Sequence, residues 1–413
     1  MTEQLPPQLN SSYDKKVGLV LQGGGALGSY QAGVYEALAA SSYMPDWVAG
    51  ISIGAINAAI IAGNSPEARV EKLHEFWNEI TAPTAWWPSA LMGPFAASQQ
   101  KTSAMTALFF GQPGFFAPRG FEEWFLPTSP TSYYNTAALK STLERLVDFD
   151  RINRPGEMRL SVGAVNVRTG NFAYFDSGKI PIRPEHVMAS GALPPGFPAV
   201  EIDGEFYWDG GLVSNTPLQY VLDYYPRRSR LVFQVDVFQS FGQLPHNLDE
   251  VSEREKDIRY SSRTRVSTRE AQEKHEIRHA INEFFETLPD EVKQTPEAKR
   301  AYAFSCVTEM DIVQLIYRPM LPQGAAKDYE FSRATMNARW EQGVADMRQT
   351  LTASPWLAPA PKDVGVRVFD VMHDILVKAF HADHVAIANG AEPPALLPAE
   401  YEHASEARTD IRE

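Results

Sequence analysis

The chain has 413 residues, more than one hydrophobic core usually organises, so one large domain with additions or two domains are expected. Its composition, 44% hydrophobic and 22% charged, is typical of a globular protein. The net charge of -13 argues against nucleic acid as a partner, because phosphate binding needs a basic face.

Cysteine usage and the first residues bear on the cellular compartment. Cys306 is the only cysteine, so no internal disulfide can form, which fits a reducing environment. Its thiol is expected in the core rather than at a reactive site. Residues 1–10 contain neither the basic nor the apolar segment of a secretory signal. We therefore expect a cytoplasmic protein, with peripheral contact at a membrane left open.

The first predicted elements form an alternating unit. After a disordered leader over residues 1–14 come a strand (16–21), a glycine loop, a helix (29–40), a strand (46–49), a sharp turn and a helix (55–62). Two apolar strands joined by a helix imply a parallel pair with a right-handed crossover, in a sheet covered on both faces. Residues 47–66 are uncharged over the length of a membrane span, but their polar residues favour a buried strand and helix.

The next segments change in character. Residues 65–80 have the apolar spacing of an amphipathic helix. Residues 82–135 are rich in proline, glycine and aromatic residues. This composition favours a loop-rich subdomain with its own small core or an oligomer contact. The alternative is a lid, or a funnel for an apolar chain, above Ser52.

The remaining elements divide into two groups. Up to residue 240 we expect strands at 160–167, 172–175, 205–208 and 231–237, with a hairpin turn at 169–171 and a helix at 185–190. Beyond it we expect a charged, solvated helix within 250–280, a helix at 328–351, a proline-rich connector at 354–365 and a helix at 367–385. The predicted organisation is therefore a first domain over 15–240, a helical extension over 241–390 and a mobile acidic tail over 391–413.

The most informative motif is Gly50-Ile51-Ser52-Ile53-Gly54, which lies between the predicted strand at 46–49 and the helix at 55–62. An abrupt strand-to-helix turn of this kind exposes a serine hydroxyl at the top of a sheet, with a helix N-terminus beneath it. That arrangement suits nucleophilic attack on an ester. Alone the motif is a weak signal.

Two further glycine motifs strengthen it. The loop Gly23-Gly24-Gly25, with Gly28 three residues later, follows the first strand and offers bare backbone N–H groups for an oxyanion. The N–H of Ile53, next to the serine, is the natural second donor. Asp209-Gly210-Gly211 ends a later strand, and its two glycines allow close approach to Ser52.

The base that activates Ser52 is open between two readings. Asp209 can serve if burial raises the pKa of its carboxyl towards neutrality. A Ser-His-Asp triad is the alternative, and its histidine would come from those after Asp209: His246, His275, His279, His373, His381, His384 and His403. None of these has a clear local signature. His186, before Asp209, is expected to be structural.

The same glycines also match a dinucleotide-binding fingerprint, Gly23-x-Gly25-x-x-Gly28. That reading needs an acidic residue at the end of the second strand. Asp46 begins that strand instead, and the elbow containing Ser52 follows its end. A nucleotide cofactor is therefore disfavoured.

On these three motifs the chain resembles the patatin-like phospholipase family. The resemblance covers residues 15–240 and implies a Ser52–Asp209 dyad without histidine, in a three-layer α/β/α fold with a mostly parallel central sheet. It implies hydrolysis of acyl esters in lipids with no metal and no cofactor. Beyond residue 240 the chain is similar to bacterial members with an additional, largely helical C-terminal region. Many members carry Arg or Lys before the last glycine of the oxyanion loop, where this chain has Leu27, so a preference for phospholipid head groups is in doubt.

The expected function is thus serine-dependent lipid acyl hydrolysis through an acyl-enzyme, with an acyl ester or lipid as substrate. The alternatives are a Ser-His-Asp esterase, an acyltransferase that uses the same residues, and a non-catalytic binding or scaffold protein on the same fold. Self-association as a homo-oligomer stays open, as does the role of residues 241–413.

Overall fold

The structure is a computed structural model that describes residues 15–81, 104, 107, 109–120, 122–123, 130–242, 244–319, 323–361 and 364–375. The predicted leader, most of the aromatic segment 82–135 and the predicted tail lie outside the described residues.

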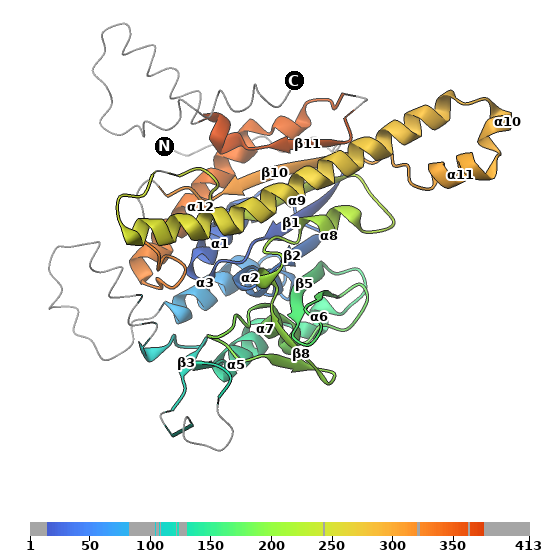
Figure 1. Ribbon diagram of the computed structural model, residues 1–413. Helices are drawn as coiled ribbons and strands as arrows, with labels where there is room; N and C mark the ends of the chain where they lie inside the picture. Colours follow the sequence, from blue (N-terminus) through green and yellow to red (C-terminus); the bar gives the residue numbers. More distant parts are fainter. Residues whose placement is uncertain are drawn as a thin grey trace, which may run out of the picture.

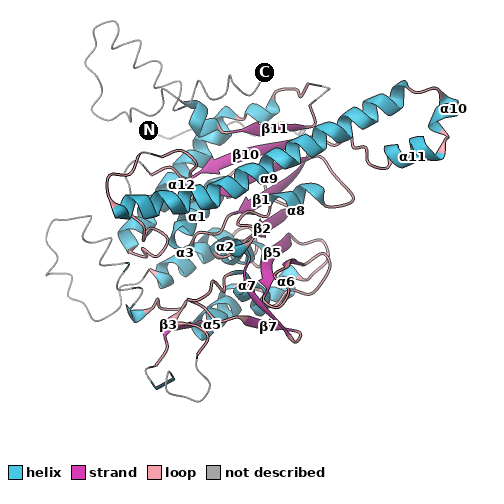
Figure 2. Ribbon diagram, viewed as in Figure 1, coloured by secondary structure: helices cyan, strands magenta, loops and turns pink. Residues whose placement is uncertain are grey.

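A nine-stranded, mostly parallel sheet forms the centre of the protein (Figure 2). Its strands are β1 (Lys16–Leu21), β2 (Trp47–Gly50), β5 (Arg159–Asn166), β6 (Phe172–Asp176), β7 (Val200–Ile202), β8 (Glu205–Asp209), β9 (Arg230–Asp236), β10 (Met310–Ile316) and β11 (Val366–Phe369). The order is β11-β10-β9-β1-β2-β5-β8-β7, and β6 also pairs with β5. The first six strands of this order are parallel, whereas β6, β7 and β8 join by antiparallel pairing.

Helices cover both faces of the sheet (Figure 1). In chain order, the described helices are α1 (Gly28–Ala39), α2 (Ile53–Ala62), α3 (Arg69–Ile80), α5 (Ala137–Leu146), α6 (Phe149–Ile152), α7 (Pro184–Ser190), α8 (Leu218–Asp223), α9 (Leu248–Thr287), α10 (Asp290–Lys293), α11 (Pro296–Tyr302) and α12 (Arg333–Ala353). Short 3-10 turns lie at Gly25–Leu27, Gly210–Leu212 and Pro355–Leu357, and β3 (Ala117–Pro118) pairs with β4 (Tyr134–Asn135).

The strands are continuous apolar runs because alternate side chains enter two different cores. In β1, Leu19 and Leu21 join the larger core, to which α1, α2, α3, α5, α7 and α12 contribute. Val20 points into the smaller core, shared with α8 and with Ala271 of α9. The three-layer α/β/α architecture expected from the sequence is confirmed.

The region after residue 240 contributes more to the sheet than the sequence indicates. It is helical for the most part, but β10 pairs in parallel with β9, and β11 with β10. The boundary predicted near residue 240 therefore falls between neighbouring strands of one sheet. The predicted helix at 367–385 is wrong at its start, because β11 occupies Val366–Phe369 and only residues 371–375 of the described part are helical.

The long helix α9 crosses the smaller-core face of the sheet, and its C-terminal end projects beyond the body together with α10 and α11 (Figure 1). On the opposite face, α12 packs along α1. No helix in the described part of the chain has the length and apolarity that a membrane span needs. The uncharged stretch 47–66 forms β2 and α2 instead.

Two glycines allow α1 and α12 to approach each other closely. A Cβ atom on Gly33 of α1 would lie 2.0 Å from the carbonyl oxygen of Trp340, and one on Gly343 of α12 would lie 2.2 Å from that of Tyr30. Backbone atoms cannot move aside as a flexible side chain does, so this contact tolerates no side chain.

We predict that Gly343→Ala lowers the free energy of unfolding by about 3 kcal/mol, because overpacking a core contact costs roughly that much. Urea denaturation measures the loss. Gly18→Ala is the control, since a Cβ there would meet side-chain atoms no nearer than 3.6 Å. Equal stability of the two variants would contradict the close helix contact.

Candidate functional site

Ser52 occupies the sharp turn between β2 and α2 with φ 55° and ψ -126°, a conformation that L-residues rarely adopt. Neighbouring glycines make the turn possible. A Cβ on Gly50 would lie 2.2 Å from the carbonyl oxygen of Gly54, and one on Gly54 would lie 2.5 Å from that of Leu21. The side chain of Ser52 is partly exposed. This is the geometry predicted for the elbow.

Ser190, the last residue of α7, anchors this strained turn. Its Oγ accepts a hydrogen bond from the backbone N–H of Ser52 at 3.1 Å, and the Ser190 side chain is fully buried. A buried serine at a helix end therefore fixes the backbone that presents the Ser52 hydroxyl.

Strand register explains how Asp209 reaches Ser52 across an intervening strand. Gly50 of β2 pairs with Val162 of β5, and Ala164, two residues further on, pairs with Asp209 of β8. Ser52 also lies two residues beyond Gly50, so Ser52 and Asp209 come level at the same end of the sheet.

Glycines remove the obstruction between them. A Cβ on Gly210 would lie 2.6 Å from the carbonyl oxygen of Gly163, and one on Gly163 would lie 2.5 Å from Cδ1 of Ile51. A side chain at position 210 would meet backbone, and one at position 163 would force the Ile51 side chain to shift. The Ser52 hydroxyl consequently lies close enough to the Asp209 carboxyl to lower its pKa.

Burial determines the acidity of Asp209, whose side chain is 2% exposed. Desolvation raises the pKa of Asp209 to about 7, against the opposing effect of hydrogen bonds from the Gly211 N–H and the Ser52 hydroxyl. The Gly211 N–H donates to Oδ1 at 2.7 Å. A carboxyl with a pKa near 7 can exchange a proton with its partner at neutral pH.

The glycine loop after β1 lies directly against Ser52, since a Cβ on Gly23 would lie 3.0 Å from Cβ of Ser52. Asn215 forms two hydrogen bonds with Gly23 of this loop. Its carbonyl oxygen accepts the Gly23 N–H at 3.1 Å, and its Nδ2 donates to the Gly23 carbonyl at 2.9 Å. The Gly23 amide is therefore engaged, and its predicted role as an oxyanion donor requires correction.

Three other predicted donors keep their amides available. The backbone N–H groups of Gly24, Gly25 and Ile53 have no hydrogen-bond partner among the described residues. Gly25 has φ +55°, and Ile53 begins α2, so its N–H belongs to the open end of a helix. Gly28 lets the loop pack on α2, because a Cβ there would lie 2.7 Å from Cγ1 of Ile53.

None of the six described histidines (His74, His186, His246, His275, His279 and His373) forms a hydrogen bond with Ser52 or Asp209. His186 is buried and its Nδ1 accepts the Arg183 N–H, a structural role as expected. His381, His384 and His403 lie outside the described residues. Nowhere in the described part is a group of three acidic, histidine or cysteine side chains placed to hold a metal.

Sequence reasoning missed Ser190 and Asn215, which hold the elbow and the glycine loop. Ser190 gives no sequence signal, because its contact crosses 138 positions. Asn215 offers a modest one, a polar residue six positions after Asp209 in the run Ser214-Asn215-Thr216-Pro217. The predicted buried position of Cys306 is confirmed.

Comparison with known families gives two matches. A family model described as patatin-like phospholipase matches residues 19–222, and one described as patatin phospholipase matches residues 258–363. The first match contains Ser52, Asp209 and the glycine loop, and the second contains β10 and α12. No curated protein matches the chain.

Solved structures give weaker likenesses. VipD from Legionella pneumophila is 14% identical with a TM-score of 0.37, covering 100% of this chain and 84% of VipD. Human GIVD cytosolic phospholipase A2 is 13% identical with a TM-score of 0.31, covering 55% of this chain and 43% of that one. The ExoU–SpcU complex from the type III secretion system of Pseudomonas aeruginosa is 18% identical with a TM-score of 0.27, covering 96% and 76%. Likenesses this distant carry no argument about the site.

We predict that stability falls as pH rises because Asp209 stays protonated in the folded chain while it ionises in the unfolded one. The pKa of Asp209 is about 7 in the folded chain, against an ordinary value of about 4. The contribution of this carboxyl to the free energy of unfolding is therefore complete below pH 4 and is lost as pH rises towards 7. Between about pH 5 and about pH 8, the free energy of unfolding of the wild type should fall by about 2 to 3 kcal/mol more than that of Asp209→Asn. Urea denaturation across this range measures the difference.

Asp236 provides a matched comparison, because burial also raises its pKa to about 7. Asp236→Asn should remove a similar part of the pH dependence. A wild-type stability curve parallel to that of Asp209→Asn would show that Asp209 is ionised throughout.

Proposed function

The chain belongs to the patatin-like phospholipase family, and on that basis we propose that it is a serine lipid acyl hydrolase working through a Ser52–Asp209 dyad. Family and fold support lipid acyl hydrolysis as the activity. The observation that carries the assignment of residues is the placement of the Ser52 hydroxyl beside a buried carboxyl whose pKa is about 7.

In the proposed first step, the Asp209 carboxylate takes the proton of Ser52 as Oγ attacks the acyl carbonyl carbon. The carbonyl π electrons move to the oxygen, and the N–H groups of Gly24, Gly25 and Ile53 stabilise the resulting oxyanion. When the tetrahedral intermediate collapses, protonated Asp209 gives its proton to the departing alkoxide. An acyl-enzyme on Ser52 and a free alcohol result.

In the second step, Asp209 removes a proton from water, which attacks the acyl carbon. Collapse of the new intermediate breaks the bond to Ser52 Oγ, and the proton on Asp209 returns to the serine. The products are a carboxylic acid and the regenerated dyad. Because one carboxyl accepts and donates a proton in both steps, a pKa near the working pH suits it to both roles.

Residues around the dyad bear on the substrate. Leu27 is fully buried in the larger core, so the position where many relatives have a cation offers none to a head group. Leu212 and Val213, directly after the Asp209 turn, are about half exposed and apolar. We propose that recognition rests on the acyl chain, with a variable alcohol portion.

We predict that Ser52→Ala and Asp209→Asn each lower kcat by about 1,000-fold or more, because each removes one half of the nucleophile-activating pair. Initial rates with 4-nitrophenyl esters of graded acyl length measure the loss. Labelling by a fluorophosphonate should occur in the wild type and be absent in Ser52→Ala.

Asp236→Asn is the matched control, since it removes another buried carboxyl with a pKa of about 7 and should keep near wild-type kcat. Full activity in Ser52→Ala would exclude the proposed nucleophile. A histidine variant that is inactive but folded would favour the triad. Acyl esters recovered in place of free acid, with alcohol present, would indicate acyl transfer.

We predict that kcat/KM rises with pH through about 7 in the wild type, because only ionised Asp209 can accept the Ser52 proton. The same rise should persist in Asp236→Asn, which leaves Asp209 intact. A pH–rate profile of each protein tests this. A flat profile through pH 7, or one that loses its rise in Asp236→Asn, would contradict the role of Asp209.

A further inference from the structure

The C-terminal region contacts the glycine loop beside the nucleophile directly. The carbonyl oxygen of Asp328, in the segment between β10 and α12, accepts the backbone N–H of Ala26 at 2.9 Å. The same oxygen would lie 2.3 Å from a Cβ on Gly25. The Asp328 carbonyl therefore packs against the backbone that carries two of the proposed oxyanion donors.

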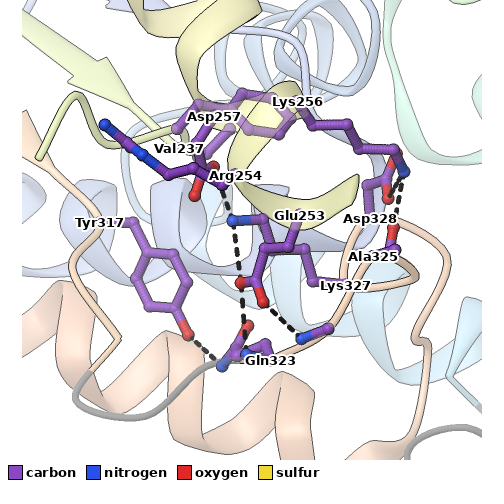
Figure 3. Close-up of polar contacts among 12 residues, drawn as sticks. Val237, Glu253, Arg254, Lys256, Asp257, Tyr317, Gln323, Ala325, Lys327 and Asp328 are labelled. Atoms are coloured by element: carbon purple, nitrogen blue, oxygen red, sulfur yellow. Dashed lines mark hydrogen bonds and ion pairs between the residues drawn. The ribbon is translucent and has the colours of Figure 1, made fainter. Parts of the chain in front are cut away.

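Acidic side chains of α9 bind the segment 323–328 (Figure 3). Glu253 accepts the N–H of Gln323 at 3.3 Å and that of Gly324 at 2.7 Å. One turn earlier, Asp249 accepts the N–H of Ala325 at 3.1 Å. Three successive amides of the segment thus bind carboxylates of one helix.

Lys327 forms ion pairs with two carboxylates of the same helix. Its Nζ lies 2.6 Å from Asp257 Oδ1 and 3.3 Å from Glu253 Oε1, and the three side chains are 2%, 4% and 9% exposed. A buried cation between two buried carboxylates loses much of its ion-pair energy to desolvation. Its main contribution is a fixed geometry, because moving the lysine would strand two charges in the interior.

The residues on either side of Lys327 are fixed as well. Lys256 of α9 donates to the carbonyl of Ala325 and to Asp328 Oδ1, both at 2.7 Å (Figure 3). Buried Arg339 of α12 donates to the carbonyl of Lys327 at 3.0 Å. The peptide that leads into Asp328 is therefore held from two helices at once.

A second contact connects Lys327 with the glycine loop. Its Nζ lies 5.8 Å from the centre of the Phe238 ring, and Cε2 of that ring would lie 3.3 Å from a Cβ on Gly24. Lys327 thus adjoins both the Gly25 side and the Gly24 side of the loop, through Asp328 and through Phe238.

We propose that Lys327 is a positioning residue: held by Glu253 and Asp257, it fixes the Asp328 carbonyl against Gly25 and Ala26 and so aims the oxyanion-binding amides at the Ser52 site. The C-terminal region is then part of the catalytic apparatus. The inference rests on the proposed function for its kinetic consequence. Its structural half, the fixing of the loop, stands independently of any activity.

The kinetic test replaces Lys327 with methionine, which keeps the length of the side chain and removes the charge. We expect kcat for 4-nitrophenyl esters to fall roughly 10-fold to 100-fold with KM changed less than about 2-fold, because misplaced oxyanion donors weaken the transition state rather than substrate binding. Lys15→Met is the matched control. Lys15 also binds two carboxylates, Asp311 at 2.9 Å and Glu309 at 2.8 Å, but at the opposite end of β1.

Hydrogen exchange tests the structural half. The backbone amide of Ala26 should exchange at least about 10-fold faster in Lys327→Met than in Lys15→Met, because this N–H loses its fixed acceptor, the Asp328 carbonyl. If Lys327→Met does not fold, Lys256→Met takes its place, since it removes the contacts to Ala325 and Asp328 from a more exposed position and should lower kcat in the same way.

The outcomes separate the two proposals. A wild type that hydrolyses no acyl ester overturns the proposed function, and exchange of the Ala26 amide then decides the inference alone. An active wild type with unchanged kcat in the folded lysine variant overturns the inference only. Equal losses of kcat in Lys327→Met and Lys15→Met, or unchanged exchange of the Ala26 amide, also overturn it.

Discussion

Desolvation of the Asp209 carboxyl is the interaction on which the rest of the site depends. Burial favours its neutral form, while the Gly211 amide and the Ser52 hydroxyl favour the charged form, and the balance leaves its pKa at about 7. A more exposed carboxyl would stay ionised and bind the serine proton too weakly. The fold meets this requirement by placing Asp209 at the end of the antiparallel strand β8, where Gly163 and Gly210 close the space around it without side chains of their own.

The parts of the site that the sequence predicts are those whose geometry is local. Ser52 needs a positive φ between a strand and a helix, and the glycines that permit this turn lie within two positions of it. The motif can therefore be recognised in one short stretch of sequence. The alternation of strands and helices up to β9 can also be recognised from the sequence, because a strand in a sheet covered on both faces requires a continuous apolar run. The pairing of Ser52 with Asp209 came from the family resemblance together with the chemical need for a base.

The parts that the sequence does not predict depend on contacts between distant residues. Whether the Gly23 amide is free depends on Asn215, which lies 192 positions away. The strand β11 has only four residues, three of which have half-buried side chains, so its segment alone does not distinguish a strand from the start of a helix. Its pairing with β10 makes it a strand. The segment 323–328 has no regular structure, and its role is visible only from the carboxylates of α9 that bind it.

These distant contacts indicate that the regions before and after residue 240 both shape the site. The glycine loop has few side chains that could fix it, because its glycines leave the amides uncovered but bring no side chains to anchor the backbone. Asn215 fixes one end of the loop from within the first family match, and Asp328 fixes the other from within the second. A loop that must be both bare and rigid has to take its rigidity from elsewhere in the chain, and here two regions far apart in sequence supply it.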